Sequence, residues 1–236
     1  MIIAAGSKRD FKDRLYAEFA RIGKAMASPH RLEILEVLAQ GERTVESLAA
    51  ETSLSVANAS RHLQQLRQAQ LVLARRDGLF VHYRLAGPEV VGLTLALRHA
   101  AEKHLAELDR VVRDFLGERE GFEPVTPDEL ARLMSNREIV LLDVRPEHEY
   151  AAGHIAGARS MPVADIKGRL SELAPNQRYV AYCRGPYCVY ADEAVSLLRV
   201  NGHEANRLSD GYPEWWLAGR PVQTGASDDH ERPSRP

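Results

Sequence analysis

The most reactive side chains of this sequence are its two cysteines, which lie in one short segment. Cys183 and Cys188 enclose the four residues Arg-Gly-Pro-Tyr, and the chain has no other cysteine. The apolar run before Cys183 predicts a buried strand, and the apolar spacing after Cys188 predicts a helix. Backbone N–H groups at a helix N-terminus favour a thiolate over a thiol, and Arg184 adds a fixed positive charge. We therefore expect Cys183 to be an activated nucleophile and Cys188 to lie close enough to resolve it.

The alternative is that both cysteines are inert and only pack the interior, since free cysteines are usually buried. The glycine, proline and arginine between them favour the reactive interpretation. In the same way, Cys188 alone has a simple alternative role, which is to pack the loop.

Composition predicts a globular protein. The 236 residues suffice for one to two domains, and 44% hydrophobic against 27% charged residues excludes a disordered chain. Two cysteines in one loop leave no disulfide framework, which is typical of a reducing cytoplasm. No apolar run approaches the length of a signal peptide core or a membrane span. We expect a cytoplasmic protein that does not contact a membrane.

The first half of the chain predicts a series of helices. Apolar residues recur at helical spacing over residues 11–26, after a loose tail. Ser28 and Pro29 are expected at the N-cap and first position of a second helix. Thr44 is expected to cap a short third helix, and a fourth spans residues 56–68.

A hairpin and a long helix complete this half. Two strand-like runs, residues 71–76 and 79–85, flank Asp77-Gly78, which is a strong hairpin signal. Pro88 begins a last helix that is expected to reach about residue 116. Residues 1–121 hold 18 Lys and Arg against 16 Asp and Glu, so this half is slightly basic and compatible with nucleic acid.

This order of elements is that of a winged helix-turn-helix, whose second helix enters the major groove of DNA by its N-terminal residues. A solvated helix face and a charged hairpin tip are the alternative. On the fourth helix, the side chains expected to contact bases or phosphates are Ser55, Asn58, Ser60, Arg61, His62, Gln64 and Gln65. Arg75 and Arg76 of the hairpin suit the DNA backbone or the minor groove.

The first half resembles the ArsR/SmtB family of bacterial repressors. The resemblance is carried by residues 27–35 (ASPHRLEIL), residues 55–66 (SVANASRHLQQL), Leu71-Val72 and the Asp77-Gly78 wing, and it covers about residues 11–117. It implies a repressor that binds a double-stranded DNA operator as a homodimer joined through its first and last helices. The operator is then an imperfect palindrome with half-sites roughly 34–36 Å apart.

Metal sensing is a further possibility that the resemblance raises. Metal sensors of the family often carry a cysteine pair on the third helix, where this chain has residues 43–47 (RTVES). A second metal site of the family uses Asp, His and Glu on the last helix. The last helix here offers His99, Glu102, His104, Glu107 and Asp109. The wider spacing of the family is not reproduced, and a metal site needs three or four converging ligands. We expect no metal site and no cofactor, with a metal-responsive regulator as the third class of function.

The second half predicts an α/β domain beyond a polar boundary at residues 117–121. Thr126 and Pro127 open a helix, and residues 139–144 form an apolar run typical of a strand buried on both faces. Short helices and strands alternate from there on, which predicts a mostly parallel sheet. The cysteine loop follows the carboxyl end of a strand, where open α/β sheets place their sites. Residues 223–236 are expected to be a disordered tail.

This half resembles a single rhodanese domain over about residues 122–222. The resemblance is carried by residues 142–145 (LDVR), 149–150 (EY), 153–158 (GHIAGA), the cysteine loop and residues 208–215 (LSDGYPEW). It implies that Cys183 accepts a sulfane sulfur as a persulfide from a small sulfur-donor anion or persulfide. Loop N–H groups would cradle that sulfur, and the candidates are Gly185, Tyr187 and Val189. Related phosphatases and arsenate reductases have a loop one residue longer that ends in arginine, so their chemistry is not expected.

We therefore expect two domains, a mainly α winged helix-turn-helix (residues 11–117) and an α/β rhodanese-like domain (residues 122–222). The protein would be a DNA-binding repressor that senses reactive sulfur or redox state, with Cys183, Arg184 and Cys188 as the reactive set. Attack of Cys188 on a Cys183 persulfide would release sulfide and leave a disulfide. The alternative function is a thiosulfate or persulfide sulfurtransferase whose N-terminal domain serves dimerisation or localisation.

Overall fold

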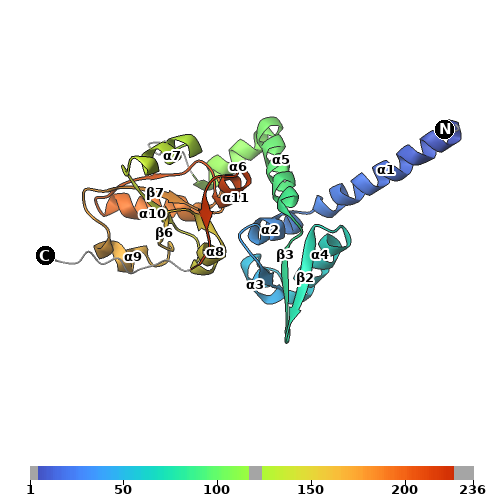
Figure 1. Cartoon of the computed structure of the whole chain (residues 1–236), viewed down its shortest axis with the longest axis horizontal. Helices are drawn as coiled ribbons and strands as arrows, with labels where there is room; N and C mark the ends of the chain where they lie inside the picture. Colours follow the sequence, from blue (N-terminus) through green and yellow to red (C-terminus); the bar gives the residue numbers. More distant parts are fainter. Residues whose placement is uncertain (1–4, 117–123, 226–236) are drawn as a thin grey trace. The chain divides into compact units, whose positions relative to one another are not determined.

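The protein is described from a computed structural model, which covers residues 5–116 and 124–225 (Figure 1). Its contacts divide the chain into two compact units, Met1–Thr94 and Leu95–Pro236. The division falls within a helix, and the polar stretch expected as the boundary, residues 117–121, lies outside the described residues. No helix in the described part of the chain is long and apolar enough to cross a membrane.

The first unit is a winged helix-turn-helix, as predicted. Its elements are α1 (Ala5–Met26), α2 (Pro29–Leu38), β1 (Arg43–Thr44), α3 (Val45–Glu51), α4 (Val56–Gln68), β2 (Val72–Asp77), β3 (Phe80–Leu85) and the start of α5 (Pro88–His104). The strands form an antiparallel sheet in the order β1-β3-β2. Fully buried Leu35, Leu48 and Leu63 bring α2, α3 and α4 into one core.

Side-chain caps explain where two of the helices begin. The Thr44 hydroxyl accepts from the Ser47 N–H at 3.2 Å, and the Ser55 hydroxyl accepts from the Asn58 N–H at 3.3 Å. Ser28 occupies the N-cap of α2 as predicted but makes no cap bond with its side chain. That helix begins at Pro29, whose ring fixes the backbone in a helical φ.

Two boundaries of the first unit differ from the sequence prediction. Helix α1 begins at Ala5 rather than near residue 11. In the hairpin, Asp77 pairs with Phe80, so Gly78 and Leu79 form the turn, one residue later than predicted. Gly78 has a φ of +58°, which glycine adopts without strain.

The long helix expected from Pro88 to residue 116 is interrupted at Leu105. Helix α5 ends at His104 and α6 spans Ala106–Leu116. The Leu108 N–H bonds the Leu105 carbonyl at 3.0 Å, so a tighter i to i−3 bond replaces the helical pattern there. No proline or glycine marks the position in the sequence.

The second unit is an α/β domain around a parallel sheet, which confirms the predicted class. Its sheet has the order β6-β4-β7-β8, and a separate antiparallel pair joins β5 to β9. Besides the end of α5 and α6, its elements are α7 (Pro127–Ser135), β4 (Val140–Asp143), α8 (Glu147–Ala152), β5 (His154–Ile155), β6 (Arg159–Ser160), α9 (Ile166–Arg169), a short 3₁₀ turn (Leu170–Glu172), β7 (Arg178–Tyr182), α10 (Val189–Val200), β8 (Glu204–Arg207), α11 (Tyr212–Leu217) and β9 (Val222–Gln223). The pairing of β9 places Gln223 in a strand rather than in the predicted tail.

Alternating residues of β7 face two separate cores. Val180 and Tyr182 pack in one core together with residues of α7 and α11. Ala181 and Cys183 pack in the other, mainly against α10. Successive side chains of a strand point to opposite faces, so the register of β7 fixes the side on which Cys183 lies.

Candidate functional site

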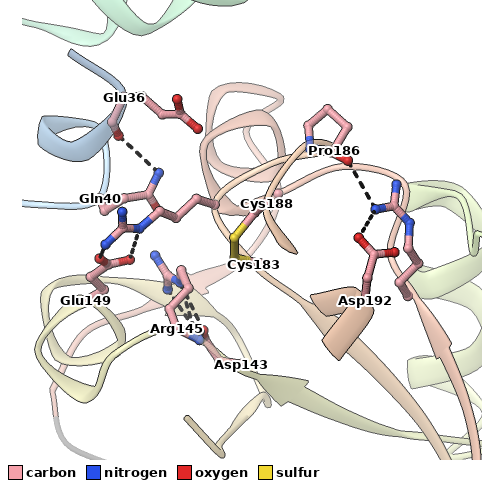
Figure 2. Close-up of a disulfide and its surroundings, with 12 residues drawn as sticks. Glu36, Gln40, Asp143, Arg145, Glu149, Cys183, Pro186, Cys188 and Asp192 are labelled. Atoms are coloured by element: carbon pink, nitrogen blue, oxygen red, sulfur yellow. Dashed lines mark hydrogen bonds and ion pairs between the residues drawn. A yellow bond between two sulfur atoms is a disulfide. The ribbon is translucent and has the colours of Figure 1, made fainter. Parts of the chain in front are cut away.

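The two cysteines lie between the end of β7 and the start of α10, and they are joined by a disulfide (Figure 2). Cys183 directly follows β7 and is only 1% exposed. Cys188 is the N-cap residue of α10 and is half-buried. The strand and the helix thus bring the two sulfur atoms within bonding reach, which a two-electron thiol–disulfide reaction requires.

Two backbone positions of this loop have no free N–H group to donate to a bound anion. The Cys188 N–H donates to the Gly185 carbonyl at 3.2 Å, and Pro186 has no N–H. Gly185 is buried, whereas the side chains of Tyr187 and Val189 are exposed at the rim. The assignment of Gly185, Tyr187 and Val189 as a cradle for an anion stays a prediction.

The positive charge expected from Arg184 is matched by a buried carboxylate. Arg184 Nε donates to Glu149 Oε2 at 3.2 Å, and its Nη2 also bonds the Glu149 carboxylate. Glu149 comes from α8 and its side chain is fully buried. Because this pair is close to neutral, stabilisation of a Cys183 thiolate would come mainly from backbone dipoles at the start of α10.

A second buried ion pair supports the sheet beside the loop (Figure 2). Arg145 Nε donates to Asp143 Oδ1 at 2.9 Å, and Nη2 donates to the Gly153 carbonyl at 2.7 Å. Burial lowers the pKa of Arg145, but the charge and hydrogen bonds of Asp143 outweigh it and raise that pKa. The Tyr182 hydroxyl donates to Asp143 Oδ2 at 2.5 Å. The side chains of Arg145 and Asp143 have no exposed surface, so this ion pair supports the fold.

The segment after β8 closes on the cysteine loop, and the sequence interpretation assigned it no role. The Tyr212 N–H donates to the Cys183 carbonyl at 3.1 Å. A Cβ added to Gly211 would lie 2.4 Å from the carbonyl carbon of Arg184 and the nitrogen of Gly185. Glycine is therefore required there by close backbone approach. The signal in the sequence for this close approach is the run Asp-Gly-Tyr-Pro, residues 210–213.

The DNA-facing residues predicted on α4 do not all share one environment. Asn58, Arg61 and Gln64 are exposed, at positions three residues apart, opposite the buried Ala59 and Leu63. These three form the exposed face of α4.

The other predicted residues of α4 have partners or packing within the first unit. The Ser55 hydroxyl caps the helix, Ser60 is half-buried, and Gln65 accepts a hydrogen bond from Arg31 of α2. His62 is half-buried, with its ring 5.5 Å from that of His30. Burial, followed by the charges of Arg31, His30 and Arg61, lowers the pKa of His62. Ser55 and Gln65 are exposed but already hydrogen-bonded, and Ser60 and His62 are half-buried, so all four are less available to DNA than the exposed face of α4.

The two arginines of the wing also differ in whether their charge is already paired with a carboxylate. Arg75 Nη2 lies 2.7 Å from Glu42 Oε1, and Nη1 lies 3.0 Å from Asp77 Oδ2. Hydrogen bonds to these two carboxylates raise the pKa of Arg75. Arg76 Nε donates to the Gly78 carbonyl at 3.3 Å, and within the described ranges no acidic side chain pairs with it. Arg76 thus presents the more available charge.

The candidate metal ligands do not converge. His99 Nδ1 lies 3.7 Å from Glu102 Oε2, and the His99 side chain is 78% exposed. In residues 5–116 and 124–225 there is no group of three or more His, Cys, Asp or Glu side chains that could hold a metal ion. Glu102 instead accepts a hydrogen bond from Tyr187.

Comparison with known proteins finds two family matches. Residues 28–73 match the family described as bacterial regulatory protein, arsR family, and residues 126–218 match the rhodanese-like domain. The HTH-type transcriptional regulator Rv0324 of Mycobacterium tuberculosis is 46% identical over 94% of this chain and 97% of its own length. A probable mercury resistance operon repressor of Streptomyces lividans is 35% identical over 40% of this chain and 75% of its own length. A homodimeric winged helix-turn-helix DNA-binding domain of Mb0332 from Mycobacterium bovis is 41% identical, covers 45% of this chain and 95% of that chain, and has a TM-score of 0.41.

Proposed function

Since this chain belongs to the arsR family of bacterial regulatory proteins and carries a rhodanese-like domain, we propose that it is a repressor whose rhodanese domain senses reactive sulfur or redox state. It is a transcriptional regulator with an ArsR-type DNA-binding region. The observation that carries the proposal is the bond between Cys183 and Cys188. Both thiols of the chain lie in the rhodanese-like domain, and the DNA-binding region has none.

The sensing reaction needs no oxidant besides the sulfur donor. The Cys183 thiolate attacks the sulfane sulfur of a polysulfide, persulfide or thiosulfate, the donor S–S bond breaks, and a shorter polysulfide, a thiolate or sulfite leaves, respectively. Cys183 then carries a persulfide. The Cys188 thiolate attacks the inner sulfur, the Cys183 persulfide bond breaks, and hydrosulfide leaves with the electron pair. Two thiols are oxidised to a disulfide while one sulfane sulfur is reduced to sulfide.

DNA recognition would use the exposed face of α4, namely Asn58, Arg61 and Gln64. Asn and Arg make bidentate contacts to adenine and guanine edges, each worth about 1–3 kcal/mol of discrimination. We expect Arg61→Ala to weaken operator binding by about tenfold or more, whereas Gln65→Ala has a smaller effect because Arg31 already holds Gln65. Fluorescence anisotropy with duplex DNA from upstream of the gene measures both, and equal losses for the two variants would contradict this assignment.

Dimerisation through the first and last helices is supported by the apolar side chains that they expose. Phe11, Tyr16 and Phe19 of α1 are each at least 60% exposed, and Phe115 of α6 is 86% exposed. Apolar surface of this extent on a regulator typically marks an interaction site. A homodimer would place two copies of α4 one helical turn of DNA apart, roughly 34–36 Å.

The second candidate function is a sulfurtransferase. It is favoured by the position of Cys183 at the carboxyl end of a central parallel strand, where α/β enzymes place their catalytic groups. In that case Cys183 passes its persulfide sulfur to an external acceptor and Cys188 is dispensable. Steady turnover of thiosulfate to thiocyanate that is unaffected by Cys188→Ser would favour this function.

The test of the proposed function measures DNA affinity and sulfur chemistry on the same samples. Fully reduced and polysulfide-treated protein are titrated into labelled promoter DNA, and intact mass reports the state of Cys183 and Cys188. We expect affinity to change together with the loss of two hydrogens that marks the disulfide, and both changes to vanish in Cys183→Ser. In Cys188→Ser the mass should stop at one added sulfur atom. Equal affinity in every thiol state would refute the sensing proposal.

A further inference from the structure

The C-terminal part of α5, from Leu95 on, belongs to the second unit and contacts the cysteine loop there. The hydroxyl of Tyr187, the residue before Cys188, donates to Glu102 Oε1 at 2.9 Å. Burial and this hydrogen bond raise the pKa of Tyr187 to about 12, so the phenol keeps its proton at neutral pH. One side chain therefore ties the cysteine loop directly to α5.

Arg98 holds the other end of this contact in place. Its Nη2 donates to Glu214 Oε1 at 2.5 Å, and its Nε lies 3.3 Å from Glu102 Oε1. A Cβ added to Gly185 would lie 3.3 Å from Arg98 Nη1, so the guanidinium also covers the loop backbone. Arg98 is thus a positioning residue for the Glu102 carboxylate that accepts from Tyr187.

The other end of α5 lies in the DNA-binding unit. Helix α5 begins at Pro88, and Val90 and Val91 in its first turn are buried. Val90 belongs to the same hydrophobic core as Leu35 of α2 and Leu63 of α4. Helix α5 is uninterrupted from Pro88 to His104. A hydrogen bond that restrains α5 at Glu102 therefore acts on the same helix whose first turn packs in the core beneath α4.

Resting on the function proposed above, we propose that the Tyr187–Glu102 hydrogen bond passes the state of the cysteine pair to α5 and thereby to DNA affinity. The disulfide closes the segment from Cys183 to Cys188 into a ring and fixes Tyr187 where it reaches Glu102. A thiol reductant supplies two electrons and two protons, breaks the S–S bond and leaves two thiols. The loop regains conformational freedom, so the hydrogen bond is formed for a smaller fraction of the time. Loss of one such bond corresponds to roughly a three- to tenfold change in an equilibrium constant.

The experiment compares full-length Tyr187→Phe and Glu102→Gln with the wild type. The matched control is Tyr190→Phe, which removes a hydroxyl three residues further on, in α10. Each protein is prepared reduced with dithiothreitol and oxidised with inorganic polysulfide. Intact mass follows the chemistry at the cysteines, and anisotropy on promoter DNA follows the affinity. Hydrogen exchange over residues 95–104 of the wild type, in both states, gives a readout that needs no variant.

We expect the change in DNA affinity between the two states to shrink by about three- to tenfold in Tyr187→Phe, compared with the wild type at equal disulfide content as read from intact mass. Tyr190→Phe keeps the full change, and residues 95–104 of the wild type exchange more slowly in the disulfide state. A Tyr187→Phe protein that responds like the wild type, or unchanged exchange over residues 95–104, overturns the transmission proposal alone. A wild type that forms the disulfide with constant DNA affinity overturns both this proposal and the proposed function.

Discussion

Gly211→Ala is the substitution for which the structure predicts the largest local effect at the cysteine loop. The added methyl group would lie 2.4 Å from the Arg184 carbonyl carbon and 2.4 Å from the Gly185 nitrogen. Both neighbours are backbone atoms, so no side chain can rotate away. The Gly211 φ of −117° is open to alanine, and the whole penalty therefore comes from steric overlap.

The overlap requires the cysteine loop and the Gly211 segment to move apart. Overpacking of this kind costs about 1–3 kcal/mol, and contact with the rigid Arg184–Gly185 peptide group places this case near the upper end. The Tyr212–Cys183 backbone hydrogen bond adjoins the clash and would lengthen with it. We expect the second unit to lose about 2–3 kcal/mol of unfolding free energy and its melting temperature to fall by roughly 8 °C.

Tryptophan fluorescence isolates this effect, because the chain has only two tryptophans, Trp215 and Trp216, and both lie in the second unit. Gly168→Ala is the matched control, since nothing lies within 4 Å of a Cβ added there. It should change the melting temperature little or raise it slightly. If Gly211→Ala melts with the wild type and forms the disulfide at the same rate, the close approach of the two segments is refuted.

Three further outcomes follow from single contacts. Asp143→Asn leaves the buried charge of Arg145 without its paired carboxylate, which should cost about 3–5 kcal/mol by tryptophan-monitored urea unfolding; a loss below about 1 kcal/mol would contradict this. Because the folded pKa of His62 lies below its unfolded value of 6.5, its contribution to stability is present above pH 6.5 and is lost as the pH falls below it. His62→Gln should therefore reduce the loss of unfolding free energy below pH 6.5, with unfolding followed by circular dichroism. An unchanged loss of stability in this pH range would exclude His62 as its source. Arg76→Ala should reduce the salt dependence of DNA binding by about one phosphate contact, and Arg75→Ala by less; equal reductions would contradict the pairing of Arg75.

Local signals predicted much of the fold. The cap of Thr44, the hairpin and the strand–loop–helix around Cys183 all depend on residues close together in the sequence, where periodicity and turn chemistry act. The alternation of strands and helices after residue 126 was sufficient to predict the parallel sheet, which the structure confirms. The break at Leu105 left no such signal, because it replaces one hydrogen-bond pattern by another without a proline or glycine.

The electrostatics of the site could not be predicted, because they depend on partners far apart in the chain. Arg184 was expected to act as a free charge, but its carboxylate partner, Glu149, lies 35 residues earlier. Arg75 is held by Glu42, 33 residues earlier, in the same way. The hydrogen bond between Tyr187 and Glu102 spans 85 residues. Residue type and spacing identify which side chains can react, whereas the fold determines which of these side chains are already paired with a partner.

The short strand β9 determines where a fragment of this protein can end. Its pairing with β5 is reinforced by the Gly157 N–H bond to Gln223 Oε1 at 3.1 Å and by the Gly225 N–H bond to the Ala151 carbonyl at 2.9 Å. A protein terminated at residue 222 would lose both bonds and leave the edge of β5 open to pairing with another molecule. Such a fragment should aggregate during purification, whereas one extended to Gly225 keeps its edge covered.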